Sequence, residues 1–177
     1  MRICVIDNRQ AGQLSEEAAG YVAELGPALA EAHKVAILTL EPRLVSLPNS
    51  VMRLRRAIAL NHPEIVHLNN VSGLLLAGVR VTIGSDAAPF QPALVLGLHD
   101  DRLRRRSAAW HRRLTGSVRL VVSPSARLLD EHLADGFFPT AIHVVIPYGM
   151  PYHAARLLEA YRRLLIDRRT GDLGRAA

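Results

Sequence analysis

Short apolar runs alternate with longer amphipathic segments along the whole chain. Runs that are apolar on both alternating faces suit buried strands, and apolar positions three or four residues apart suit helices. We therefore expect strands at 2–7, 35–40, 65–68, 93–98, 119–122 and 142–146. We expect helices at 15–32, 49–60, 101–114 and 152–166, one starting at Ser72, and one running from Pro124 to near Gly136. This alternation with short connections predicts a doubly wound, mainly parallel α/β sheet of the Rossmann-like kind.

Several segments do not fit this regular alternation of strands and helices as clearly. Residues 79–83 suit either the end of a helix or a short strand. Pro27 should kink the first helix or leave an irregular turn, and Asn49 is expected to cap the second. The segment 167–177 is polar and contains glycine, so we expect a frayed tail.

The strand at 93–98 stops abruptly at His99 and Asp100. In open parallel sheets, ligands bind beyond the carboxyl ends of the strands, so these two side chains stand where chemistry is expected. The alternative is structural: Asp100 or Asp101 caps the next helix, and His99 is a hydrogen-bonded turn residue. Both interpretations remain open at this point.

Composition narrows the class of protein. The chain has 177 residues, 49% of them hydrophobic and 21% charged, which is typical of a globular domain. No apolar run approaches the roughly 20 residues of a membrane helix, and the N-terminus has no signal-peptide pattern. The single cysteine, Cys4, excludes an intramolecular disulfide. We expect a cytoplasmic protein.

Sequence fingerprints exclude several chemistries. Only one glycine, Gly12, follows the first strand, so neither a dinucleotide fingerprint nor a P-loop fits, which argues against a dehydrogenase or a nucleotide kinase. The histidines have no zinc-like spacing, and we expect no metal site. With aromatic residues at 5% and no recognised motif, we expect no nucleic-acid partner.

The segment 101–114 is strongly basic within a chain of net charge +6. At helical spacing Leu103, Trp110 and Leu114 form one stripe, which should face the sheet. The outward positions hold Arg102, Arg105, Arg106, Arg112 and Arg113. This surface is either a solvated face or a patch for phosphate or anionic lipid, so peripheral contact with an anionic membrane stays among the expected partners.

Four further segments have recognisable sequences. Residues 65–74 read IVHLNNVSGL, 96–100 read LGLHD, 121–129 read VVSPSARLL, and 142–150 read IHVVIPYGM. In this order and spacing they resemble the VHLHNLSGL, TLHD, VVAPSRFLR and IPYGMD segments of family-four retaining glycosyltransferases. Residues 156–165, RLLEAYRRLL, resemble the final helix of that family, which folds back across the N-terminal domain.

The resemblance implies one half of a GT-B fold. Residues 1–151 would be its N-terminal, acceptor-side domain, and residues 152–166 would be the helix packed back on it. The implied activity is hexosyl transfer from a nucleotide sugar to an acceptor, with retention and without a metal or other cofactor. His99 and Asp100 would take the catalytic positions. The implied substrate-binding residues are Gly12, Asn69, Asn70, Ser72, Ser123, Ser125 and Arg127.

Two departures from the family pattern limit this expectation. The family has a glycine pair after its first strand, where this chain has only Gly12, so the resemblance does not extend to the contact of that loop with the donor diphosphate. The family's second, donor-binding domain has no counterpart in this sequence. The alternatives are a non-catalytic Rossmann-like binding module, or one subunit of a split enzyme with a donor-domain partner. A homodimer is also open, and the chain alone is expected to be inactive.

Overall fold

A computed structural model describes residues 1–8, 16–31, 33–40, 47–69, 73–83, 91–105, 108–149 and 152–173. Its strands are β1 (Arg2–Asn8), β2 (Lys34–Leu40), β3 (Ile65–Asn69), β4 (Ala93–Gly97), β5 (Leu120–Ser123) and β6 (Ile142–Val145). Its helices are α1 (Glu16–Ala30), α2 (Leu47–Asn61), α3 (Gly73–Ile83), α4 (Arg102–Arg105), α5 (Ala108–Thr115), α6 (Ala126–Ala134) and α7 (His153–Leu173). The strands form one sheet in the order β2-β1-β3-β4-β5-β6, and every pair is parallel.

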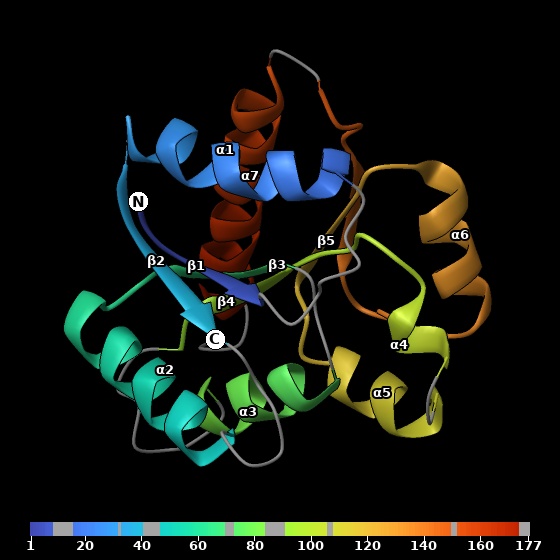
Figure 1. Cartoon of the computed structure of the whole chain (residues 1–177), viewed down its shortest axis with the longest axis horizontal. Helices are drawn as coiled ribbons and strands as arrows, with labels where there is room; N and C mark the ends of the chain where they lie inside the picture. The colour runs from blue at the N-terminus through green and yellow to red at the C-terminus, as the bar shows by residue number, and fades with distance from the viewer. Residues whose placement is uncertain are drawn as a thin grey trace.

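Helices cover both faces of this sheet (Figure 1). On one face, α1 and α7 pack over Val5, Ile65 and Val95. On the other, α2 to α6 pack over the alternate strand positions, such as Val66 and Leu96. The expectation of a doubly wound, parallel α/β domain with a C-terminal helix packed on it is confirmed.

Residues 79–83 are helical. Val79 and Thr82 are buried, whereas Arg80 and Val81 are exposed. The Thr82 hydroxyl donates to the carbonyl oxygen of Gly78, four residues back, at 2.9 Å. This spacing is that of a helix lying on the sheet, and the β-branched residues that resembled a strand end α3 instead.

Three expected helix boundaries differ from those observed. Helix α1 continues across Pro27 to Ala30. Pro27 lies close to the end of the helix and removes a single backbone hydrogen bond from it. Helix α2 begins at Leu47, which places Asn49 in the first turn rather than at the cap. Pro48 lies within that turn, where a missing N–H costs little. Helix α6 begins at Ala126 rather than Pro124.

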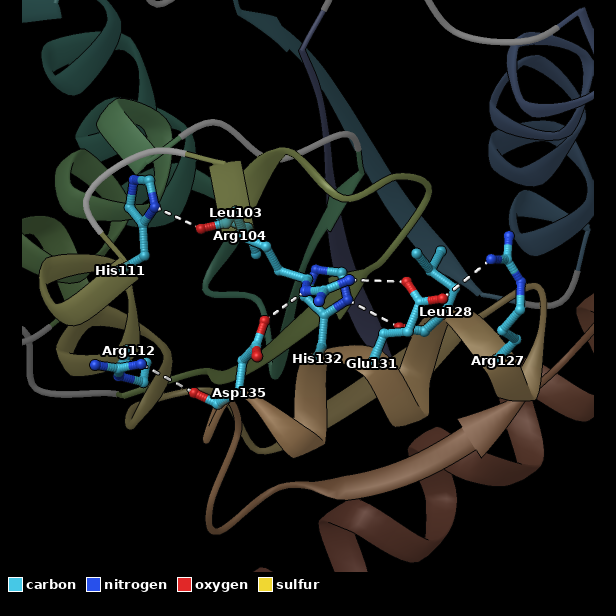
Figure 2. Close-up of polar contacts among 9 residues, drawn as sticks. All are labelled: Leu103, Arg104, His111, Arg112, Arg127, Leu128, Glu131, His132 and Asp135. Atoms are coloured by element: carbon cyan, nitrogen blue, oxygen red, sulfur yellow. Dashed lines mark hydrogen bonds and ion pairs between the residues drawn. The ribbon is translucent and has the colours of Figure 1, made fainter.

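The expected helix at 101–114 is divided into α4 and α5, and the stripe through Trp110 is wrong. Leu103 and Leu114 are buried, but Trp110 is 40% exposed. His111 is buried instead, and its Nδ1 hydrogen-bonds to the carbonyl oxygen of Leu103 at 2.7 Å (Figure 2). Because α5 starts anew after α4, a helical phase counted from Leu103 does not carry over to it.

Arg104 ties α4 to α6. Its guanidinium donates to Asp135 Oδ2 at 2.5 Å and to Glu131 Oε2 at 2.8 Å (Figure 2). Helix α6 ends next to Gly136, whose φ of 77° is the left-handed conformation that glycine adopts readily, as the sequence predicted. These contacts hold the loop after β4 against the other helices on this face of the sheet.

Helix α7 is longer than expected and runs to Leu173, through much of the segment assigned to a frayed tail. Leu157, Tyr161 and Leu164 are buried in the core between α7, α1 and the sheet. The expected apolar stripe of this helix therefore packs as predicted. In the described residues, none of the helices combines the length and the apolar character needed to cross a membrane.

Candidate functional site

Polar side chains gather where β3 and β4 end. Asn69 is the last residue of β3, and it pairs in register with Gly97, the last residue of β4. His99 lies two residues beyond the end of β4, and its Nε2 is 3.4 Å from Asn69 Oδ1. The two residues that the sequence placed at this edge are thus brought together, on the sheet face covered by α1 and α7.

Gly97 leaves the space that this cluster occupies. A Cβ on Gly97 would lie 2.6 Å from Asn69 Oδ1 and 3.0 Å from both His67 Nε2 and His99 Nε2. Three polar atoms, two from β3 and one from the loop after β4, therefore converge on one backbone position. No residue with a side chain fits there without displacing them.

Aromatic rings from three other parts of the chain enclose His99. Its Nδ1 hydrogen-bonds to the Tyr148 hydroxyl at 2.5 Å, and the two rings stack with centroids 5.8 Å apart. Tyr21 of α1 lies 5.6 Å from the His99 ring and 5.4 Å from the Tyr148 ring. His153, at the start of α7, lies 4.4 Å from Tyr21. The imidazole is thereby held in one orientation.

His67 forms the inner end of the cluster. It is fully buried in the middle of β3, and its Nδ1 hydrogen-bonds to the Tyr161 hydroxyl of α7. The two rings meet edge to face with centroids 5.9 Å apart. This contact joins the C-terminal helix to the strand that carries Asn69.

Burial keeps both central histidines neutral. The pKa of His99 is lowered from 6.5 to about 4 by loss of solvent, with a further contribution from the charge of His153. The pKa of His67 is lowered from 6.5 to about 3, again chiefly by burial and then by His99 and His153. At neutral pH each ring therefore offers one donor and one acceptor and no positive charge.

Four buried polar atoms of this cluster have no hydrogen-bond partner among the described residues: Tyr21 Oη, His67 Nε2, Asn69 Nδ2 and His153 Nε2. Buried polar atoms are normally satisfied by protein, ordered water or ligand. Their concentration at one edge of the sheet makes this edge the candidate site. These four atoms belong to uncharged groups, and hydrogen bonding by such groups suits hydroxyl groups.

The other expected site residues are distributed as follows. Ser125 is the N-cap of α6 and accepts from the N–H of Leu128 at 3.2 Å, while Ser123 donates to the Ser125 carbonyl at 2.9 Å. Arg127 pairs with Glu131 on the exposed side of α6 at 3.0 Å (Figure 2). Asp100 lies beside His99 and is partly exposed. Gly12, Asn70 and Ser72 lie outside the described residues.

Sequence reasoning missed most of the enclosing residues: Tyr21, His67, Tyr148, His153 and Tyr161. A signal existed for His67, because a histidine inside an apolar strand needs a buried partner. Tyr161 was assigned only to the packing stripe of its helix. Within the described part of the chain, no three histidine, cysteine, aspartate or glutamate side chains are grouped to hold a metal ion.

Comparison with known proteins identifies the fold. No protein-family model and no curated protein matches the sequence. Among solved structures, S. aureus MnaA in a co-structure with UDP matches with a TM-score of 0.56 and 14% identity, over 82% of this chain and 43% of that one. A candidate UDP-N-acetylglucosamine 2-epimerase from Listeria monocytogenes matches with a TM-score of 0.51 and 15% identity, over 79% and 43%.

These matches show a Rossmann-like α/β fold that corresponds to one half of a GT-B-like protein. The chain spans less than half the length of either neighbour. The expectation of a glycosyltransferase-like fold is therefore confirmed at the level of architecture.

Proposed function

We propose that this chain is the acceptor-side half of a nucleotide-sugar enzyme, and that it serves hexosyl transfer with retention. The observation that carries the proposal is the pair His99–Asn69 at the carboxyl ends of β4 and β3. Two independent features support it: the four sequence segments that resemble family-four glycosyltransferases, and a fold shared with MnaA, which was solved with UDP.

His99 would contact the sugar rather than the diphosphate. With Nδ1 accepting from the Tyr148 hydroxyl, Nε2 carries the ring proton and donates towards Asn69 Oδ1. A sugar hydroxyl that enters next to Asn69 meets this N–H donor, the amide oxygen and the amide Nδ2. No residue of the cluster of His67, Asn69, Gly97, His99 and Tyr148 is cationic at neutral pH, so the charge of the departing nucleotide diphosphate would be balanced by the other half.

In the proposed transfer, the acceptor oxygen forms its bond to the anomeric carbon on the face from which the nucleotide diphosphate leaves. The acceptor proton leaves with the diphosphate. This chain would supply orientation, because a well-placed pair of reactants accounts for a large part of a barrier reduction. Asp100 would take a polar contact on the acceptor side, and Ser123, Ser125 and Arg127 would line the neighbouring loop edge.

Ligand titration followed by NMR tests this assignment. Titrating UDP-glucose and UDP-N-acetylglucosamine into the 15N-labelled chain should shift the His99 ring and Asn69 amide signals, whereas UDP alone should leave them unchanged. His99→Ala should remove the response to the sugar. Absence of any shift at both residues with either nucleotide sugar and with free hexoses would contradict the proposal.

Activity of the isolated chain provides a second test. Without a donor-binding half, it should hydrolyse or transfer nucleotide sugars no faster than the uncatalysed background. Turnover by the purified chain that His99→Ala abolishes would show that this chain contains a complete active site, and the half-enzyme assignment would be wrong.

A second candidate is a non-catalytic binding module, or one subunit of a split enzyme that works with a separate donor-binding chain or as a homodimer. The chain covers 43% of each neighbour, which is compatible with both candidates. The complete reading frame and its neighbours distinguish the two: a second α/β domain in the same frame favours the single enzyme. Such a domain in an adjacent frame that co-purifies with this chain favours the split one.

A further inference from the structure

The outer surface of the helical layer opposite the candidate site has an unusual composition. Helices α2, α3 and α5 lie side by side below the sheet (Figure 1). Arg80 of α3 donates to the carbonyl oxygen of Arg113 of α5 at 2.6 Å, which joins two of them directly. We call this surface the basic face; its exposed arginines are Arg53, Arg55, Arg56, Arg80, Arg112 and Arg113.

The three helices that form the basic face contribute cations and no anions to it. The sequences of α2, α3 and α5 include no aspartate or glutamate. Elsewhere in the described chain some arginines pair with carboxylates, as Arg104 does with Glu131 and Asp135, and Arg163 with Glu159. The charge of +6 is therefore distributed unevenly, and positive potential concentrates on one side of the molecule.

Large apolar side chains are exposed among these arginines. Met52 and Leu60 of α2 are 62% and 70% exposed, and Val81 of α3 is 63% exposed. Trp110 of α5 is 40% exposed. Met52 and Val81 lie about half a helical turn from the buried Leu54 and Val79 of their own helices, so they point away from the core.

We propose that the basic face docks on the surface of an anionic lipid bilayer. Arginines near such a surface are attracted to its negative headgroups, and exposed Trp, Leu, Met and Val side chains gain by entering the headgroup–acyl boundary. A nucleic acid would use the arginines, but it would find no role for Met52, Leu60 and Val81 and a single aromatic ring on which to stack a base. The combination of both side-chain types favours the membrane.

This surface differs from the basic patch expected from sequence alone. That patch was one helix at 101–114, whereas the basic face combines three helices and takes Arg112, Arg113 and the exposed Trp110 from that segment. The side chains of Arg102, Arg105 and Arg106 lie outside the described part of the chain. It lies on the sheet face opposite α1 and α7, so docking would leave the cluster around His99 uncovered. The proposal does not depend on the proposed function.

Trp110 is the only tryptophan of the chain, so its fluorescence reports on the basic face directly. Vesicles of phosphatidylcholine with about one-third phosphatidylglycerol should shift its emission to shorter wavelength and carry the protein with them in a flotation assay. Vesicles of phosphatidylcholine alone should do neither. Raising the salt from about 0.05 M to about 0.5 M should reverse binding, because screening shortens the reach of the charges.

Two double variants that lower the net charge equally distinguish binding through the basic face from binding through the overall charge of the protein. Arg53→Gln with Arg56→Gln should weaken partitioning of the protein onto anionic vesicles about tenfold or more, because each arginine at the interface raises the partition coefficient several-fold. Arg156→Gln with Arg162→Gln, both exposed on α7, should change it less than about twofold. Leu60→Ser leaves the net charge unchanged and should reduce the shift of the Trp110 emission that vesicles cause.

Three outcomes would overturn the proposal. They are equal weakening by both double variants, equal binding to neutral vesicles, and arginine-dependent binding to duplex DNA without any response to anionic vesicles. The last result would assign the face to nucleic acid instead. Circular dichroism of each variant, unchanged from the parent chain, ensures that loss of binding is not loss of fold.

Discussion

The Tyr161 hydroxyl of the C-terminal helix hydrogen-bonds to Nδ1 of His67, a histidine fully buried in the centre of the sheet. Residues 94 positions apart in the sequence thereby share one polar contact in an apolar surrounding. An unsatisfied polar atom in such a place costs about 1–3 kcal/mol. The contact therefore specifies how α7 is seated on β3.

Removing this hydroxyl should be costly. Tyr161→Phe leaves His67 Nδ1 buried and unpaired, so the free energy of unfolding should fall by about 1–3 kcal/mol in urea denaturation. Tyr152→Phe is the matched control, because Tyr152 is 53% exposed, and its stability should stay within about 0.5 kcal/mol of the parent. Similar losses in the two variants would show that the Tyr161–His67 contact contributes little.

Gly97 gives a second prediction. In Gly97→Ala, the new methyl group would meet Asn69 Oδ1, His67 Nε2 and His99 Nε2, so we expect a loss of about 1–3 kcal/mol and displaced histidine ring signals. Gly20→Ala in α1 meets nothing within 4 Å, and a helical glycine replaced by alanine should stabilise by about 0.5–1 kcal/mol. Opposite signs in the two melting temperatures are the expected result. An unchanged melting temperature for Gly97→Ala would contradict the packing around the candidate site.

Acid should destabilise the fold through the buried histidines. The pKa values of His99 and His67 are lowered to about 4 and about 3, while the unfolded chain titrates near 6.5. Between these values the unfolded state binds more protons, so stability is complete above pH 6.5 and falls as pH drops towards 4. The slope is up to about 1.4 kcal/mol per pH unit for each histidine. Burial lowers the pKa values of His132 and His153 too, which adds to the same trend.

Chemical denaturation at pH 7, 6 and 5 measures the slope of the free energy of unfolding against pH. His99→Asn should flatten it by the contribution of one histidine. An equal slope in the parent chain and in this variant would mean that His99 is protonated as easily in the folded as in the unfolded state.

The C-terminal helix should be indispensable to the fold. Leu157→Ala removes a fully buried side chain and should cost about 2–5 kcal/mol, whereas Ile166→Ala, at 60% exposure, should cost less than about 0.5. A chain ending at residue 151 should melt at markedly lower temperature or aggregate. An unchanged melt and unchanged solubility of that deletion would mean that α7 is dispensable.

The sequence predicts the layers of this fold well, because buried parallel strands and covering helices have different apolar periods. All six strands were located within two residues of their observed ends, and the stripe of α7 was recognised from Leu157, Tyr161 and Leu164. The break between α4 and α5 was missed. It is shown in the described residues by the hydrogen bond between His111 and the Leu103 carbonyl, eight positions apart, a separation that a continuous helix would not bridge.

The candidate site was predicted only in part, for a similar reason. His99 and Asn69 follow strands, and strand ends of a parallel sheet meet at one edge, so topology alone brings them together. Tyr21 and Tyr148 come from distant segments, and their positions depend on how α1 and the chain after β6 are packed. Ser125, which the family resemblance assigned to substrate binding, is also the N-cap of α6, a role that this residue type favours.

The position of α7 in the chain has a consequence for synthesis. The sheet face formed by Val5, Ile65 and Val95 is complete once β4 has been made, but its cover, Leu157 to Leu164, is translated much later. At about 5–20 residues per second, that apolar face waits several seconds in the nascent chain. A chaperone that binds exposed apolar strands has that interval in which to act, and the synthesis of α7, rather than strand pairing, sets when this domain can close.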